Sequence, residues 1–227
     1  MILVLVKFNK RCYHKSMQII KYEHSCLDIQ EKSDRLVVDP GVLSRSLTNL
    51  SSIKALVITH VHPDHFDEQK VRTIIDVNPD IHVFSTGEVA QKLTYISVTV
   101  PDLNKVYKVG DISLEFFGQK HAMILPSLPL IENFGVLVND KLYYTGDSFT
   151  PCPKPHVTLG ITTSAPWMKI SETADFIRSD SATRVFPCHD GFLNNDGRNL
   201  VNGLVRTVVE ASGKEYLILD QDTALDL

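Results

Sequence analysis

The sequence predicts a layered α/β fold, and the order of its apolar segments carries that prediction. Strand-like runs alternate with segments of helical periodicity, as in 55–59 followed by 67–77. The run 55–59 is almost entirely apolar, which is typical of a strand buried on both faces. Hydrophobic residues make up 43% of the 227 residues and charged residues 22%, so the chain has enough apolar material for a sizeable core.

The predicted strands are bounded by turn residues. Pro40-Gly41 ends the third strand, and Asn139-Asp140 separates two apolar runs as in a β-hairpin. We expect strands at 18–22, 26–29, 35–39, 55–59, 81–84, about 104–109, 112–117, 135–138, 141–144, 183–186 and 215–219.

Three helices are predicted between these strands. The segment 67–77 has apolar residues at helical spacing, and the segment 85–93 opens with the spacing of a capping box. A third helix contains Leu200, Leu204 and Val208 and ends at Gly213.

Charge and cysteine content narrow the class of protein. The formal net charge is −4 and no basic tract occurs, so charge does not favour nucleic acid as a partner. None of the four cysteines forms a C-x-x-C pair, which favours a reducing compartment and a cytoplasmic enzyme. The apolar start is broken by Lys7 and is too short for a membrane span. We expect residues 1–16 to be an N-terminal extension and 17–227 to form one domain of undefined oligomeric state.

The most informative segment is His60-Val61-His62-Pro63-Asp64-His65-Phe66-Asp67. It holds three histidines and two aspartates, and imidazole and carboxylate groups bind Zn²⁺, Mn²⁺ or Fe. In an extended segment, which Pro63 favours, His60 and His62 point the same way, whereas Asp64 and His65 reach a second position. One loop can thus supply two neighbouring metal ions. The alternative interpretation is an ordinary polar surface loop.

Three further metal-binding side chains follow predicted strands. His121 comes after 112–117, Asp147 after 141–144 and His189 after 183–186. The carboxyl ends of strands in layered α/β proteins supply residues to one common site, so these side chains can converge with the histidine-rich loop. The alternatives are a loop role for the first, a turn role for the second and a core role for the third.

The segment Thr59 to His65 resembles the H-x-H-x-D-H motif of the metallo-β-lactamase superfamily. The resemblance extends over most of the chain, because the segments 24–27, 36–41, 144–148 and 187–191 fit further motifs of its lactonase-like and phospholipase-like branch in the right order. It implies a four-layer αββα sandwich.

The resemblance also implies a ligand set and a reaction. His60, His62 and His121 are expected to bind a first divalent ion, Asp64, His65 and His189 a second, and Asp147 to bridge the two. The ions are expected to be Zn²⁺, with Mn²⁺ or Fe as alternatives. The implied reaction is hydrolysis by a metal-bridged hydroxide, with Asp64 and Asp147 as the catalytic residues.

Two alternatives come from other classes of protein. The first is a diiron redox enzyme, but that branch of the family carries a carboxylate where this chain has His62. The second is a non-catalytic metal-binding or regulatory protein on the same fold, which would not need a complete ligand set.

The substrate is expected to be a small molecule such as a lactone, a phosphodiester or another ester. The chain has no basic patch and lacks the long inserted domain of the RNA-cleaving members of the superfamily. The apolar segment 122–131 directly follows His121. It either borders the cleft, which implies an apolar part in the substrate, or is a buried connection between strands.

Supporting roles are predicted for residues outside the ligand set. We expect Asp39 to orient a ligand histidine and Asp67 to cap the following helix. His24 either bonds to the ligand loop or packs beneath the site. His156 is interpreted as a surface-loop residue, with a place in the cleft as the alternative, and Trp167 is expected near the cleft.

Overall fold

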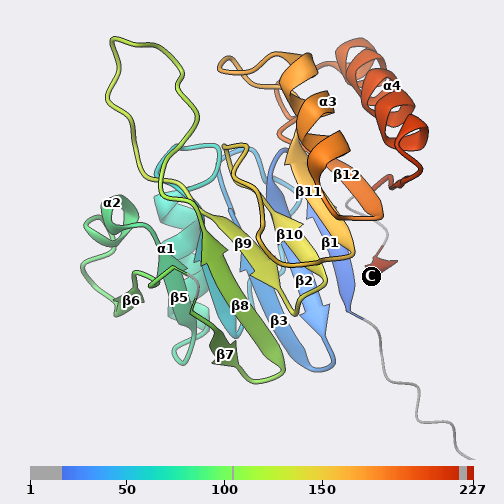
Figure 1. The fold of residues 1–227 in the computed structure, drawn as a ribbon. Helices are drawn as coiled ribbons and strands as arrows, with labels where there is room; N and C mark the ends of the chain where they lie inside the picture. The colour runs from blue at the N-terminus through green and yellow to red at the C-terminus, as the bar shows by residue number, and fades with distance from the viewer. Residues whose placement is uncertain (1–16, 104, 220–223) are drawn as a thin grey trace, which may run out of the picture.

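The computed structural model describes residues 17–103, 105–219 and 224–227 (Figure 1). The predicted extension, residues 1–16, lies outside the described residues. The strands of one sheet are β1 Gln18–Tyr22, β2 Cys26–Glu31, β3 Asp34–Val38, β4 Ala55–Ile58, β5 His82–Ser85, β6 Val98–Thr99 and β14 Leu225–Asp226. The strands of the other are β7 Tyr107–Val109, β8 Ile112–Phe117, β9 Gly135–Val138, β10 Leu142–Tyr144, β11 Thr158–Thr162, β12 Arg184–Cys188 and β13 Glu215–Tyr216.

Both sheets are mixed, and helices cover their outer faces. The strand orders are β14-β1-β2-β3-β4-β5-β6 and β13-β12-β11-β10-β9-β8-β7. The helices are α1 Glu68–Val77, α2 Gly87–Ala90, α3 Ile170–Ser179 and α4 Asn195–Ala211. Within the described residues, none of them combines the length and the apolar content that crossing a membrane requires.

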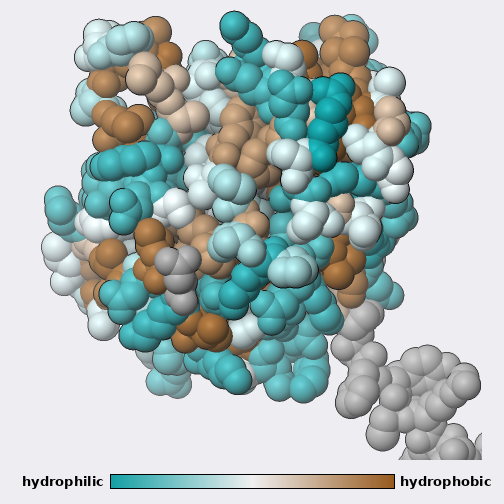
Figure 2. Space-filling model, viewed as in Figure 1, coloured by the Kyte–Doolittle hydropathy of each residue, from teal (hydrophilic) through white to brown (hydrophobic). Residues whose placement is uncertain are grey.

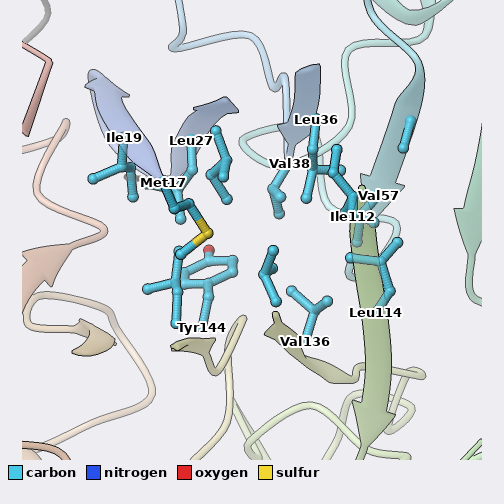
Figure 3. Close-up of a cluster of buried hydrophobic side chains, with 14 of the residues drawn as sticks. Met17, Ile19, Leu27, Leu36, Val38, Val57, Ile112, Leu114, Val136 and Tyr144 are labelled. Atoms are coloured by element: carbon cyan, nitrogen blue, oxygen red, sulfur yellow. The ribbon is translucent and has the colours of Figure 1, made fainter. Parts of the chain in front are cut away.

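The main core lies between the two sheets. Leu27 from β2 and Tyr144 from β10 belong to a buried cluster in which side chains of both sheets point toward one another (Figure 3). On the outer faces, Ile74 of α1 packs on the first sheet, and Ile177 of α3 and Val209 of α4 pack on the second. This is the four-layer αββα arrangement that the sequence predicts.

Local chemistry explains two elements that agree with the sequence. Asp67 caps α1, because its Oδ1 accepts hydrogen bonds from the backbone N–H groups of Gln69 at 3.1 Å and Lys70 at 3.2 Å. Asn139 and Asp140 form the turn between the antiparallel strands β9 and β10, with φ angles of 51° and 52°. Both residues tolerate the positive φ angles that this tight turn between the paired residues Val138 and Leu142 requires.

Other elements differ from the sequence prediction. The predicted capping box is wrong, because the N-cap of α2 is Thr86, whose side chain makes no capping hydrogen bond. The hydroxyl of Ser85 donates instead to the carbonyl oxygen of Thr86. The sequence patterns also miss β11 and α3. Gly160 interrupts the apolar run of β11, and one of the three buried side chains of α3 is the polar Thr173, whereas all three of α1 are apolar.

Strand direction brings the candidate ligands to one edge. β8 and β10 are each antiparallel to β9, and β10, β11 and β12 are mutually parallel. Consequently β8, β10 and β12 end at the same edge of their sheet. β12 runs through Cys188, further than predicted, so that His189 follows the strand directly.

Candidate metal centre

The seven predicted ligands come together in two adjacent groups. Ligand atoms of the first group all lie within 4.8 Å of one another, and the same holds for the second group. The first group contains His60, His62, His121 and Asp147, and the second contains His24, Asp64, His65 and His189. This division is the one that the motif implies, with His24 as an additional member.

Asp147 lies between the two groups. Its Oδ2 is 3.0 Å from Nε2 of His189, 3.4 Å from Nε2 of His121 and 4.0 Å from Nε2 of His60. Its Oδ1 is 3.4 Å from Nε2 of His65. One buried carboxylate therefore faces histidines of both groups, as a bridging ligand must.

Asn133 holds the turn that carries Asp147. Its Oδ1 accepts a hydrogen bond from the backbone N–H of Asp147 at 2.9 Å, and its Nδ2 donates to the carbonyl oxygen of Thr145 at 3.2 Å. Thr162, at the end of β11, also donates to Oδ1 of Asp147 at 3.3 Å. Sequence reasoning missed both residues, because neither belongs to a metal-binding motif and β11 has no strong pattern.

Trp167 lies at the site, as the sequence predicts. Its Nε1 donates a hydrogen bond to Oδ2 of Asp147 at 3.2 Å, and its ring centroid is 5.8 Å from that of His121. The direct bond to the carboxylate was not predicted, because the chain places the two residues in different loops.

The hydrogen bonds of three histidines fix their tautomers. Nδ1 of His65 lies 2.7 Å from Oδ2 of Asp39, as expected for a carboxylate that orients a ligand histidine. Nδ1 of His121 and Nδ1 of His189 lie 2.5 Å and 2.6 Å from backbone carbonyl oxygens. Carbonyl oxygens only accept, so each Nδ1 donates, and in the neutral ring the lone pair is on the Nε2 that faces Asp147.

The donor set fits divalent metal ions. Within the described residues, the buried Nε2 atoms of His60, His121 and His189 have no hydrogen-bond partner. Buried polar atoms are rarely left in this state, and several converging lone pairs beside a carboxylate are satisfied by a cation. Burial also lowers the pKa of His60 well below its ordinary value, which keeps the ring neutral and able to bind a metal.

Charge is balanced within the second group. Burial raises the pKa of Asp64, but the neighbouring imidazoles of His189 and His24 outweigh burial and hold that pKa well below its usual range. Burial lowers the pKa of His189, but the carboxylates of Asp147 and Asp64 outweigh it and raise that pKa to about 10, so a metal ion that binds Nε2 must displace its proton. The position between the two carboxylates thus attracts positive charge.

His24 bonds to the ligand loop rather than packing passively beneath it. Its Nδ1 accepts a hydrogen bond from the backbone N–H of Gly191 at 3.1 Å, so the proton of the neutral ring is on Nε2. That Nε2 lies 3.0 Å from Oδ2 of Asp64. Burial lowers the pKa of His24 to about 4, so the ring is neutral near pH 7. Because both ring nitrogens of His24 have hydrogen-bond partners, the ring is held in place and positions the carboxylate of Asp64.

The ligand loop needs glycine at position 41. A Cβ atom on Gly41 would lie 1.9 Å from the carbonyl oxygen of Asp64. The turn after β3 therefore approaches the loop backbone more closely than any side chain allows.

The interpretation of His156 as a surface-loop residue is wrong, and so is its alternative in the cleft. Its side chain is fully buried and its Nε2 lies 3.0 Å from Oδ1 of Asp180. It precedes the first residue of β11, whereas Thr162 at the other end of that strand contacts Asp147. His156 thus lies at the opposite end of β11 from the metal centre.

The chain belongs to the metallo-β-lactamase superfamily. The family described as "Beta-lactamase superfamily domain" matches residues 18–163. Protein Rv0786c of Mycobacterium tuberculosis (strain ATCC 25618 / H37Rv) is 31% identical over 217 residues, which cover 92% of this chain and 99% of that protein.

Two solved structures show the range of chemistry on this fold. Igni18, a metallo hydrolase from the hyperthermophilic archaeon Ignicoccus hospitalis, has a TM-score of 0.71 and 15% identity, covering 93% of this chain and 98% of its own. CmlA, a diiron β-hydroxylase from Streptomyces venezuelae, has a TM-score of 0.68 and 12% identity, covering 94% of this chain and 54% of its own. At these identities the likeness shows the fold alone.

Proposed function

We propose that this protein is a hydrolase that uses two divalent metal ions to cleave a small ester-type substrate. The observation that carries the proposal is the convergence of histidine Nε2 atoms from both groups on the carboxylate of Asp147. The first ion would be held by His60, His62, His121 and Asp147, and the second by Asp64, His65, His189 and Asp147.

The two aspartates differ in their access to the cleft. The side chain of Asp64 is 17% exposed, whereas that of Asp147 is 3% exposed. Asp64 can therefore contact an attacking water molecule and orient it by accepting a hydrogen bond, while Asp147 stays a ligand. When bound, divalent ions polarise the substrate oxygen and generate a nucleophile from water at neutral pH.

The donor set favours zinc hydrolysis over diiron redox chemistry. Five of the seven proposed ligands are histidines, and His62 supplies nitrogen where the redox branch is expected to supply a carboxylate. Nitrogen-rich sites of this kind suit Zn²⁺, and zinc has no redox chemistry. A cavity opens beside His62 and His121, which supports access of a substrate and favours an enzyme over a non-catalytic metal protein.

Metal analysis combined with an activity screen tests the proposal. We expect purified protein to bind two transition-metal ions per chain and to hydrolyse lactones, phosphodiesters or thioesters when loaded with Zn²⁺ or Mn²⁺. Asp147→Asn should lose bound metal and activity. Asp67→Asn is the matched control, because asparagine also caps a helix and Asp67 lies outside both groups. Folded wild-type protein that binds no metal, or Asp147→Asn with full activity, would refute the proposal.

A further inference from the structure

The segment 122–131 forms a closed loop at the edge of the metal centre. It contains no charged residue, and Ser127 is its single polar side chain. Its base is closed where the N–H of His121 donates to the carbonyl oxygen of Ile131 at 3.1 Å and where Lys120 and Glu132 form an isolated β-bridge. In Figure 1 this yellow-green loop between β8 and β9 projects from the body of the molecule.

Four large apolar side chains of the loop are exposed to solvent. Met123 is 61% exposed, Leu125 53%, Leu128 51% and Leu130 48%. Figure 2 shows hydrophobic residues gathered at the upper left, where the loop projects. Contiguous exposed apolar side chains of this kind mark a binding surface. Two prolines restrict the backbone, so the surface is largely formed before anything binds.

The apolar surface continues into the metal centre. A cavity of about 390 Å³ is lined by the loop together with His62 and His121. This volume falls within the range of about 300–1,000 Å³ that small-molecule sites occupy. Because the two histidines belong to the first ligand group, a molecule in this cavity has one end against the metal ligands and the other against leucine side chains.

We propose that the loop pocket, residues 122–131 with His62 and His121, binds the apolar part of the substrate, an aliphatic chain carried by the ester. The inference rests on the proposed function, because it assumes that the reacting group lies at the ligands. The loop has no charged side chain that would hold a charged substituent. An alkyl chain bound against Leu125 and Leu128 would remove the apolar surface of these side chains from water, which is favourable.

A series of p-nitrophenyl esters from acetate through butyrate and hexanoate to octanoate measures this preference. We expect kcat/KM to rise roughly fourfold for each methylene until the pocket is filled. Leu125→Ser combined with Leu128→Ser should flatten the series while metal content stays unchanged. Leu200→Ser is the matched control, because Leu200 is a 66% exposed leucine on α4. A series that is flat in the wild type, or unchanged in the double variant, would overturn the inference.

Binding of 1-octanol, followed by NMR, separates this inference from the proposed function. If octanol binds the wild type but not the double variant, the loop pocket is supported. If no ester is cleaved in the same experiments, the hydrolase proposal is wrong while the pocket remains. Ester cleavage without chain-length preference or octanol binding removes the pocket and leaves the hydrolase proposal intact. If the double substitution abolishes co-sedimentation with phosphatidylcholine vesicles and leaves the ester series unchanged, the loop contacts a lipid surface and the inference is wrong.

Discussion

Asp39 fixes the orientation of His65, because its Oδ2 lies 2.7 Å from Nδ1 of the imidazole. The same carboxylate accepts hydrogen bonds from the backbone N–H and the hydroxyl of Thr59, each at 2.7 Å. It thus ties the end of β4, where the ligand loop begins, to a histidine within that loop. Asp39 itself has a φ of 49°, a conformation that asparagine also tolerates.

Asp39→Asn tests this connection. The amide keeps the shape and the backbone conformation but replaces the charged acceptor of the His65 proton. We expect Zn²⁺ affinity at the second group to fall by about 10- to 100-fold, as is typical when the partner of a ligand histidine is lost. Competition with a chelating dye measures the affinity, and Asp67→Asn serves as the control. An unchanged affinity would show that Asp39 is only a structural residue.

His24→Asn should weaken one metal position selectively. His24 contacts Asp64 of the second group and no described residue of the first, and its φ of 52° suits asparagine. The shorter side chain does not reach Oδ2, so Asp64 loses its orientation. Native mass spectrometry at rising chelator concentration should show a species with one ion that the wild type lacks. His82→Asn, an exposed histidine on β5, should behave like the wild type. Equal loss of both ions would contradict the assignment.

Trp167 should report metal binding through its fluorescence. It is the single tryptophan of the chain, and its Nε1 donates to the carboxylate oxygen of Asp147 that faces three histidines. A cation beside that oxygen changes the electric field at the indole ring. Titration of chelator-treated protein with Zn²⁺ should therefore shift the emission, and the shift should saturate at the stoichiometry found by metal analysis. In Asp147→Asn the emission shift should disappear. A shift that persists in this variant would show that Trp167 does not report metal binding at Asp147.

The sequence indicates the candidate ligands better than it indicates the residues that hold them in place. The histidines of the loop after β4 are recognisable because imidazole and carboxylate groups recur at short spacing after a buried strand. The prediction for His189 rests on its place after a predicted strand and on the resemblance of 187–191 to a motif of the family. The contacts of Asn133 and Trp167 with Asp147 could not be found this way, since they depend on how separate loops meet. Tertiary contacts between polar side chains leave no periodic pattern in a sequence.

The sequence also does not show which segments are exposed to solvent. The apolar composition of 122–131 is compatible with a buried connection, yet the loop projects and borders the cleft. The proline-rich stretch before β11 favours a surface loop, yet His156 is buried there. In each case composition alone does not say which neighbouring elements cover a segment. In the second case the ring of His156 contacts Asp180, the C-cap of α3, and Tyr143 of β10, which are distant in the sequence.

The buried pair of His156 and Asp180 makes stability depend on pH. Nδ1 of the imidazole lies 3.0 Å from the carbonyl oxygen of Lys154, and Nε2 lies 3.0 Å from Oδ1 of Asp180. Both ring nitrogens face acceptors, so the arrangement suits the doubly protonated ring. Burial lowers the pKa of His156, but the hydrogen bonds with Asp180, Cys152 and the Lys154 backbone, together with the charge of Asp180, outweigh burial and raise that pKa to about 10.

The folded state therefore binds the His156 proton more tightly than the unfolded state, whose pKa lies near 6.5. The pair's contribution to stability is fully present below pH 6.5 and is lost as the pH rises toward about 10. His156→Gln leaves the buried Asp180 carboxylate without its charged partner and with the Ala182 N–H as the donor to Oδ1, so we expect a loss of about 3–5 kcal/mol in the free energy of unfolding below pH 6.5. Urea denaturation of chelator-treated protein should show this difference shrinking steadily at alkaline pH. Lys214→Gln is the control near Asp180, since its ammonium donates to the backbone carbonyl oxygen of Asp180 and not to the carboxylate oxygen that faces His156. A difference that stays constant up to pH 10 would mean that His156 is neutral in the folded protein.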